Sequence, residues 1–320
     1  MAGSSGNTPS RGLGFEQPIL ELEHKIEELK NLAATTGMDL NGEIEPLRDR
    51  CARLLEETYA KLEPWQGVEV ARHPKRPMVA DYVEALVDDF FELAGDRAYA
   101  DDRAIVTGFG RIDGRRVLIV GHRKGTNTAE KIQCHFGCAH PEGYRKALLK
   151  MKLAEKYGIP IVSLIDTPGA YPGIGAEERG QAYAIAKNIF EMARLRTPII
   201  CIVTGEGGSG GALGIGVGDV VCVLQHAYYS VISPEGCAAI MWKDGSMAPR
   251  AAEALKLTAA DLEGFGIIDE VIPEPLGGAH RDPAGMARIL RDRIVHHLDR
   301  LGEIPTPELL EKRYQKFRAL

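Results

Sequence analysis

The sequence lacks a long uninterrupted run of apolar residues. No stretch approaches the roughly 20 consecutive apolar residues that a helix needs to cross a bilayer, so we expect no transmembrane segment. The first residues, MAGSSGNTPSRGLG, also lack the apolar centre of a signal peptide, and we expect residues 1–14 to form a flexible tail. An excess of positive charge is missing too. The formal net charge of −6 at pH 7 argues against nucleic acid as the main ligand.

The sequence has few cysteines, and they are scattered. Six cysteines in 320 residues do not form a disulfide framework, so we expect reduced thiols and a cytoplasmic location. One short cluster holds residue types that bind zinc: Cys134, His135, Cys138 and His140. A structural zinc site usually pairs two such clusters across a longer loop, and no second cluster lies nearby. We therefore expect no metal on this chain and interpret the cluster as a loop before a helix at Pro141.

The N-terminal part of the chain carries two helical patterns. Within residues 15–63, apolar positions three and four residues apart predict two amphipathic helices that form a hairpin. Such a hairpin cannot bury its apolar face alone, so it must pack on the main domain or on another subunit. Residues 64–77 hold three prolines and a basic run, and we interpret them as a linker with a solvated charged face.

The middle of the chain alternates apolar strands with glycine-rich turns and helices. Residues 79–93 are expected to form a helix, and Asp113-Gly114 marks a β-hairpin. Two strands, at 159–165 and 199–203, are each followed by a turn and a helix. This order predicts a mainly parallel sheet with both turns near one another at the same end. Residues 281–320 are expected to be C-terminal helices.

The second of these turns lies in Pro198–Gly214, PIICIVTGEGGSGGALG. A buried strand, five glycines between positions 205 and 211, and a helix start follow one another directly. This arrangement places backbone N–H groups at the positive end of a helix, with no side chains in the way. It predicts a site for negative charge, either a bound anion or an oxyanion that develops during a reaction.

Three chemistries match this turn. GEGGSG at 205–210 fits a dinucleotide fingerprint, but that motif wants an acidic residue after the next strand, and Gln225-His226 stands there. GGSGG fits a nucleophile elbow with Ser209 as the nucleophile and Asp269 and His280 as downstream partners. Five residues of glycine-rich sequence match that pattern easily by chance. In the third interpretation, backbone amides alone stabilise an enolate-like or ureido oxyanion. A phosphate-binding P-loop is excluded, because no Lys-Ser/Thr pair closes the turn.

Several motifs together identify a family. They are RHPKRP at 72–77, GHRKG at 121–125, FG and PEGYRKAL within 136–148, DTPGAYPG at 166–173, AEERGQ at 176–181, GEGGSGGA at 205–212, YSVISPEGCA at 229–238, TAADL at 258–262 and EPLGGAH at 274–280. In these motifs, spread over residues 15–280, the chain resembles the α subunits of bacterial acetyl-CoA carboxylase carboxyltransferases. The resemblance implies an α/β fold of the crotonase/ClpP type, a ββα superhelix, over residues 78–280. The N-terminal helical hairpin and the C-terminal helices flank it.

The resemblance also implies an activity and partners. The family transfers a carboxyl group from N-carboxybiotin, held on the biotin carboxyl carrier protein, to acetyl-CoA. The product is malonyl-CoA for fatty-acid synthesis. The expected partner is a homologous β subunit in an α₂β₂ assembly, with biotin carboxylase in the same complex. That β subunit bears a zinc ribbon, whose Cys₄ pattern this chain lacks.

The resemblance finally implies site residues. The oxyanion-stabilising backbone amides fall on Gly169, Ala170, Gly207, Gly208, Gly210 and Gly211, and the helix start favours Gly210. The substrate-binding residues are expected at His122, Arg123, Lys124, Tyr171 and Pro172. The basic loop at 121–125 is a candidate anion site also because strands position it. Two other hypotheses remain open at this point: a serine hydrolase that uses Ser209, and a noncatalytic scaffold that binds a partner.

Overall fold

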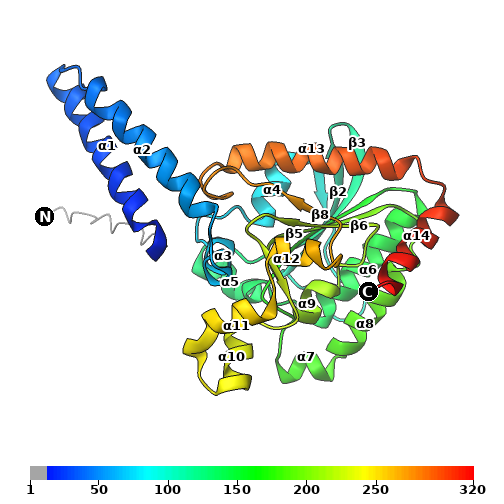
Figure 1. Cartoon of the computed structure of the whole chain (residues 1–320). Helices are drawn as coiled ribbons and strands as arrows, with labels where there is room; N and C mark the ends of the chain where they lie inside the picture. The colour runs from blue at the N-terminus through cyan, green and yellow to red at the C-terminus, as the bar shows by residue number, and fades with distance from the viewer. Residues whose placement is uncertain (1–12) are drawn as a thin grey trace, which may run out of the picture.

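The computed structural model describes residues 13–320 (Figure 1). The tail expected at 1–14 therefore lies almost entirely outside the described residues. The helices are α1 Gln17–Thr36, α2 Asn41–Tyr59, α3 Pro64–Ala71, α4 Val79–Leu86, α5 Thr128–Gln133, α6 Pro141–Lys156, α7 Ile174–Glu178, α8 Gln181–Met192, α9 Ser209–Leu213, α10 Pro234–Trp242, α11 Ala248–Leu255, α12 Ala259–Gly264, α13 Pro283–Gly302 and α14 Thr306–Arg318. The strands are β1 Asp88–Glu92, β2 Ile105–Ile112, β3 Arg115–His122, β4 Ile161–Thr167, β5 Ile199–Gly208, β6 Val220–Leu224, β7 Tyr228–Ser230 and β8 Glu270–Ile272.

One mixed sheet forms the centre of the molecule. Its order is β1-β2-β3-β4-β5-β6-β8, and β7 pairs with the far end of β5. The strands from β3 to β8 pair in parallel, whereas β1, β2 and β3 pair antiparallel at one edge. Figure 1 shows α4 and α13 over one face of the sheet and α6 and α8 over the other. The prediction of a mainly parallel sheet with a β-hairpin around Asp113-Gly114 is confirmed.

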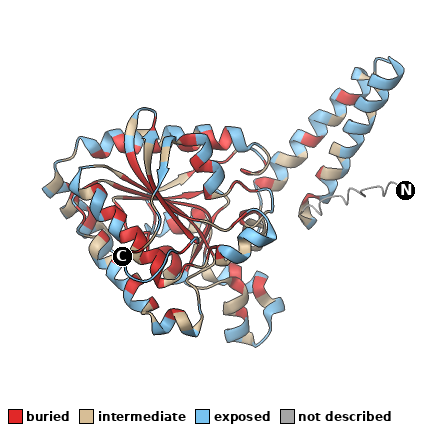
Figure 2. Cartoon of the chain, turned by 180° about the vertical axis from the view of Figure 1, so that it is seen from behind, coloured by how far each residue is buried: buried red, intermediate tan, exposed pale blue. Residues whose placement is uncertain are grey.

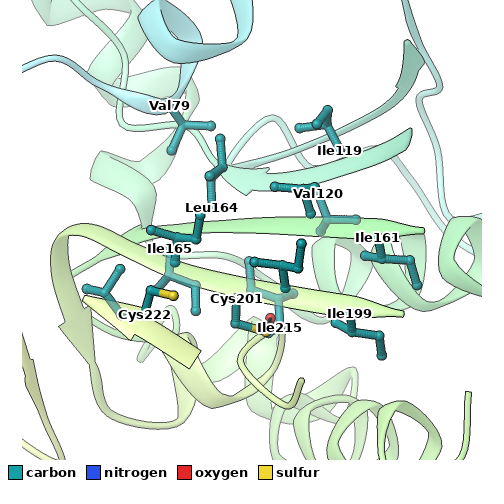
Figure 3. Close-up of a cluster of buried hydrophobic side chains, with 14 of the residues drawn as sticks. Val79, Ile119, Val120, Ile161, Leu164, Ile165, Ile199, Cys201, Ile215 and Cys222 are labelled. Atoms are coloured by element: carbon teal, nitrogen blue, oxygen red, sulfur yellow. Dashed lines mark hydrogen bonds between the residues drawn. The ribbon is translucent and has the colours of Figure 1, made fainter. Parts of the chain in front are cut away.

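The core lies along the parallel strands. Every residue of β4, β5 and β6 is buried, as the near-continuous runs of Ile and Val in these strands predict for a sheet covered on both faces. Figure 3 shows Ile161, Leu164 and Ile199 packed in this layer, with Val79 of α4 on its edge. Cys201 and Cys222 also point into it as small apolar side chains. The strand ends that carry the two turns are therefore held rigidly.

The predicted helical hairpin is present and projects from the body (Figures 1 and 2). Ile19, Ile26, Ile44 and Cys51 form its narrow apolar seam, and most other side chains of α1 and α2 are exposed. Its base is fixed by charge. The Glu16 carboxylate accepts a hydrogen bond from the Tyr59 hydroxyl (2.8 Å) and pairs with Arg281 Nη2 (2.9 Å). No helix among residues 13–320 is long and apolar enough to cross a bilayer.

Two expectations about local structure are wrong. The helix expected at 79–93 stops at Leu86, and β1 follows, because Phe91 pairs with Phe109 of β2 at the sheet edge. Sheet pairing here outweighs the helical spacing of the apolar residues. The linker expected at 64–77 contains α3. Its prolines conceal a helix start, since Pro64 occupies the first turn and the Gln66 side chain accepts the Glu63 N–H (2.8 Å).

A buried ion pair joins the segment after α3 to the chain after β8. The Arg76 guanidinium bonds Glu274 through two nitrogens (2.6 and 2.9 Å) and donates a third bond to the Thr204 carbonyl (2.9 Å). The Glu274 carboxylate also accepts the backbone N–H groups of His226 (2.9 Å) and Ala279 (2.7 Å). Burial alone would raise the pKa of Glu274, but the Arg76 charge lowers it from 4.5 to about 2. The pair is thus charged and fully bonded.

We expect Glu274→Gln to lower the free energy of unfolding by about 3–5 kcal/mol, because Arg76 would keep an uncompensated buried charge. The folded-state pKa of Glu274 lies below the unfolded value, so its stabilisation is present above pH 4.5 and is lost as the pH falls toward 2. Urea denaturation at several pH values measures both effects.

Glu308→Gln is the matched control, since Glu308 pairs with Lys312 on an exposed helix face. It should change the free energy of unfolding by less than about 1 kcal/mol. Equal effects of the two substitutions would show that the buried pair does not stabilise the fold.

Candidate active site

The two turns meet at the carboxyl ends of β4 and β5, which are neighbouring parallel strands. A Cβ atom on Gly211 would lie 2.4 Å from the Gly169 carbonyl carbon and 2.5 Å from the Ala170 nitrogen. A Cβ atom on Gly208 would lie 2.2 Å from the Pro168 oxygen. The chain after β4 and the start of α9 can therefore touch only because both positions are glycine. The prediction that the two turns lie together is confirmed.

The strand before α9 is longer than expected. β5 continues past Val203 to Gly208, because β7 pairs with its last residues and brings Gly207 into register with Tyr229. The reversal into α9 then falls on Ser209, whose φ of 50° is left-handed. Gly207 and Gly208 are strand residues, so the sheet ladder is the expected partner of their backbone groups.

The geometry separates the six predicted amides into groups. The Gly169 N–H already donates to the Thr167 hydroxyl (3.1 Å). The first N–H groups of α9, including those of Gly210 and Gly211, have no acceptor within the helix. The Ala170 nitrogen lies directly beside Gly211. The role of all six in the reaction stays a prediction, and the structure brings Ala170, Gly210 and Gly211 together.

A cavity of about 510 Å³ opens beside α9. Ser209 and Gly210 from the start of α9 line it, and Val231, Phe265 and Phe317 are among its apolar side chains. A mostly apolar cavity beside a helix start suits a compact group that ends in a carbonyl oxygen.

A buried network of charges lies behind the two turns. Lys124 Nζ is 2.6 Å from Asp166 Oδ1 and 2.7 Å from Glu206 Oε1. The other oxygen of Glu206 accepts bonds from Arg72 Nε and from the Tyr228 hydroxyl, both at 2.7 Å. Asp166 Oδ1 also accepts the Glu206 N–H (2.9 Å). Because Asp166 and Glu206 lie near the carboxyl ends of β4 and β5, the network fixes the spacing of the two strand ends.

Glu206 and Lys124 are held in their charged forms by their partners. Burial would raise the pKa of Glu206, but the charges of Lys124 and Arg72 lower it to about 2. Burial would likewise lower the pKa of Lys124, and the two carboxylates raise it instead. These groups therefore hold one another and are not free to exchange protons near neutral pH.

The basic loop expected to bind substrate is mostly turned inward. His122 is buried, and burial together with the Lys124 charge lowers its pKa to about 3, so the ring is neutral. Its Nδ1 accepts the Asp166 N–H (3.4 Å). Arg123 is half-buried and pairs with Glu92 (3.0 Å). A substrate contact of His122, Arg123 and Lys124 stays a prediction, with Arg123 the most accessible of the three.

Tyr171 and Pro172 lie in the loop that carries Ala170. The Tyr171 ring stacks on His140, with ring centroids 4.0 Å apart and an angle of 21°. Gln181 donates to the Tyr171 carbonyl (3.0 Å), which ties the loop to the start of α8. Pro172 is exposed. The substrate role of both residues stays a prediction.

The residues of the hydrolase hypothesis are spread apart. Asp269 accepts the Val221 N–H (2.7 Å) and pairs with Lys316 (2.8 Å). His280 stacks on His73 with ring centroids 3.9 Å apart, near the base of the hairpin. Ser209 has the left-handed turn of a nucleophile elbow but receives neither partner.

Sequence reasoning missed the roles of Arg72 and Glu206. Arg72 belongs to a basic run for which the sequence predicts a solvated face. Glu206 stands between Gly205 and Gly207, in a motif whose interpretation depends only on its glycines. A charged residue inside an apolar strand run followed by glycine is a signal that could have found Glu206, because such a residue must be paired when buried.

The family model described as acetyl co-enzyme A carboxylase carboxyltransferase-like matches residues 12–320. The acetyl-coenzyme A carboxylase carboxyl transferase subunit alpha of Rhodopirellula baltica is 54% identical over 309 residues, which are 97% of this chain and 97% of that protein. The protein of the same name from Methylococcus capsulatus is 54% identical over 304 residues and covers 95% of each chain.

Solved structures agree with the fold. Transcarboxylase 12S, solved with methylmalonyl-coenzyme A and methylmalonic acid bound, matches 71% of this chain with a TM-score of 0.58 and 23% identity. The β subunit of P. aeruginosa geranyl-CoA carboxylase matches 74% with a TM-score of 0.56 and 20% identity. This chain spans 42% and 44% of those two chains, respectively. The predicted crotonase-type α/β fold is confirmed.

The sequence identity to the curated relatives is much higher than the identity to the solved structures. The sequence match runs over nearly the whole length of this chain and of its relatives, at more than half identity. The chain therefore belongs to the acetyl co-enzyme A carboxylase carboxyltransferase-like family.

Proposed function

We propose that this chain is the α-type subunit of an acetyl-CoA carboxylase carboxyltransferase, which makes malonyl-CoA for fatty-acid synthesis. The observation that carries the proposal is the contact between the two turns, which sets the Ala170 amide beside the start of α9 at the edge of an apolar cavity. Identity of 54% to proteins of that name supports it.

The groups that this chain offers fit the proposed substrates. N-carboxybiotin, when bound, supplies the carboxyl group that acetyl-CoA receives. The cavity beside α9 would hold an apolar ring system, and Gly210, which lines it, would point its N–H group at a carbonyl oxygen there. Donors of this kind are worth about 3–4 kcal/mol each when negative charge develops on the oxygen they bind.

The proposed chemistry needs no side-chain nucleophile from this chain. His122 is buried and neutral, and Lys124 is held by two carboxylates. What this chain contributes is fixed geometry: backbone donors that β4 and β5 position before the substrate arrives. Preorganised donors stabilise developing charge without the cost of reorienting at the moment of reaction.

The proposal includes partners. The relatives are named as alpha subunits, which supports a multi-subunit enzyme. We propose a zinc-ribbon β subunit in an α₂β₂ assembly, with the biotin carboxyl carrier protein and biotin carboxylase, in the cytoplasm. Exposed apolar side chains on the helices around the site offer a contact surface: Ile174 (80% exposed), Tyr183 (70%) and Ile240 (72%).

We expect Gly211→Ala to lower turnover at least a hundredfold, about 2.7 kcal/mol in the barrier, because its methyl group would force the Ala170 turn away from α9. Gly302→Ala is the control, because Gly302 lies at the end of α13, outside the site, and a Cβ atom there would meet nothing within 4 Å.

Malonyl-CoA formation by each variant, reconstituted with a β subunit, measures the difference. Near-normal turnover by Gly211→Ala, in a protein that assembles like wild type, would overturn the assignment of the two turns as the site.

Ser209→Ala should keep most of the transferase activity. Ser209 occupies a left-handed turn and is given no base by the structure, so its hydroxyl is not needed for the reaction. Since alanine tolerates φ of 50° less well, Ser209→Asn serves as a second variant that suits this conformation. A loss beyond a hundredfold in both variants, together with an acyl-enzyme seen by mass spectrometry, would favour the hydrolase instead.

The isolated chain should be inactive and should gain activity with a β subunit. One pair of turns provides one set of amides, whereas the reaction develops charge on two separate substrates. Malonyl-CoA formation measured before and after adding the β subunit, with size-exclusion chromatography of the mixture, tests this. Full turnover by the isolated chain contradicts it, and so does failure of the two chains to co-elute, which would favour the scaffold hypothesis for another partner.

A further inference from the structure

A second cavity, of about 460 Å³, is lined by His140, on which Tyr171 stacks, and the proposed carboxyl transfer makes no use of it. Two histidines and a buried aspartate line it: His135, His140 and Asp102. One potential ligand atom from each of the three lies within 4.8 Å of the others. These three atoms can bind one ion without breaking a side-chain hydrogen bond or ion pair of the three residues.

The backbone bends so that the two histidines meet. His135 and Phe136 both have left-handed φ values, 48° and 55°, which turn the chain back on itself before α6. The rings of His135 and His140 then lie with centroids 4.3 Å apart at 66°. A left-handed φ is rare for a bulky residue such as Phe136 and less so for histidine, and this turn leaves the two imidazole rings next to each other.

The Asp102 carboxylate is aimed by the backbone. Its Oδ2 accepts the His140 N–H (2.7 Å) and its Oδ1 accepts the Ala104 N–H (2.9 Å). A Cβ on Gly143 would lie 2.8 Å from Oδ2, so a glycine in the first turn of α6 leaves room for this oxygen. Lys146 bonds the Asp102 carbonyl (2.6 Å) and not its carboxylate. Each carboxylate oxygen keeps a second lone pair for a cation.

We propose that Asp102, His135 and His140 bind one divalent transition cation of the Zn²⁺, Co²⁺ or Ni²⁺ type. Imidazole and carboxylate donors together suit these ions, whereas Mg²⁺ and Ca²⁺ prefer sets of oxygen atoms. Three protein ligands leave the remaining positions to water, so the ion exchanges with solvent. This proposal reverses the expectation of no metal on the chain. That expectation rests on the sequence spacing of Cys134, His135, Cys138 and His140, whereas this site recruits Asp102 from another segment and uses neither cysteine.

Charges around the cavity are compatible with a cation. Arg179 also lines it, but its guanidinium bonds the Glu142 carboxylate (2.8 and 3.2 Å). Arg103 is directed to the Gln133 side chain. Asp102 is therefore the carboxylate in the cavity whose charge is not matched by a bonded basic side chain.

A second group of metal-type residues serves as an internal comparison. Glu16, His73 and His280 are also close together. There, however, Glu16 is bonded by Tyr59 and Arg281, and the two imidazole rings are stacked at 27°. A cation would have to break these contacts, so this group is the less suitable of the two.

An ion bound at the proposed site would affect the position of a loop in the candidate active site. His140 is stacked on Tyr171, and Tyr171 follows Ala170 in the same loop. An ion that fixes the His140 ring would also fix the face on which Tyr171 rests. The inference about binding stands on Asp102, His135 and His140 alone and does not depend on the proposed transferase activity.

The test titrates Zn²⁺ into the untagged full chain, stripped with a chelator, by isothermal calorimetry. Co²⁺ in place of Zn²⁺ gives a visible absorption spectrum that reports imidazole and carboxylate ligation. His135→Asn is the main variant, since asparagine tolerates the left-handed φ at this position. His140→Gln is a second variant at another ligand. His73→Asn and His24→Asn are the controls, in the comparison group and on the exposed face of α1.

We expect one ion per chain in the wild type, a dissociation constant raised at least tenfold in His135→Asn and His140→Gln, and no change in the two controls. Added Mg²⁺ in hundredfold excess should not displace the ion. Thermal unfolding with Zn²⁺ should show a rise in melting temperature that both ligand variants lose. Unchanged affinity in both ligand variants, or loss of binding in His73→Asn, overturns the proposal. These readouts involve no turnover, so failure of the proposed function leaves their outcome unaffected.

Discussion

The close approach of two backbone segments is the constraint on which the rest of this structure depends. The turn after β4 and the start of α9 are so close that a Cβ atom at Gly208 or Gly211 would clash with the backbone of the turn. The contact therefore requires glycine at both positions. Two further conditions must hold for that contact to exist. The strands β4 and β5 must be neighbours with their carboxyl ends level, and the ends must not drift apart. The buried parallel core meets the first condition, and the network around Lys124 and Glu206 meets the second.

That network has a structural role beside a proposed site whose chemistry needs no charged side chain from this chain. A carboxylate lies near the end of each of two adjacent strands, and one lysine bridges them. Breaking one partner would leave the others uncompensated in a dry interior, which costs several kcal/mol. Apolar residues could fill the same volume, yet they would not fix direction. Ionic hydrogen bonds do fix it, and the two turns inherit that alignment.

The sequence predicted the parts of this architecture that follow from local pattern. The Ile- and Val-rich strands, the hairpin at Asp113-Gly114 and the seam of the N-terminal helices each carry their own period or turn signal. Prediction from the sequence failed where a partner strand from a distant segment determines the secondary structure. The run after Leu86 becomes a strand because β2 is beside it, and β5 extends to Gly208 because β7 arrives from another segment. The six candidate amides were likewise chosen as a set, since only the fold reveals that Gly169 is already bonded by Thr167.

A site made of backbone groups also places the sensitive positions where side-chain reasoning does not look. Removing a side chain at Ser209 takes nothing from the proposed chemistry, whereas adding one methyl group at Gly211 separates the two donors. The same logic accounts for the inward-facing basic loop: Lys124, whose contact with substrate stays a prediction, pairs with the carboxylates near the two strand ends that carry the turns. In the proposed site the Lys124 charge acts indirectly: it positions the strand ends that carry the neutral backbone donors. Because backbone donors carry no protonation equilibrium near neutral pH, the proposed contribution of this chain to catalysis depends on distance, and the ion pairs of Lys124 with Asp166 and Glu206 hold the strand ends that set that distance.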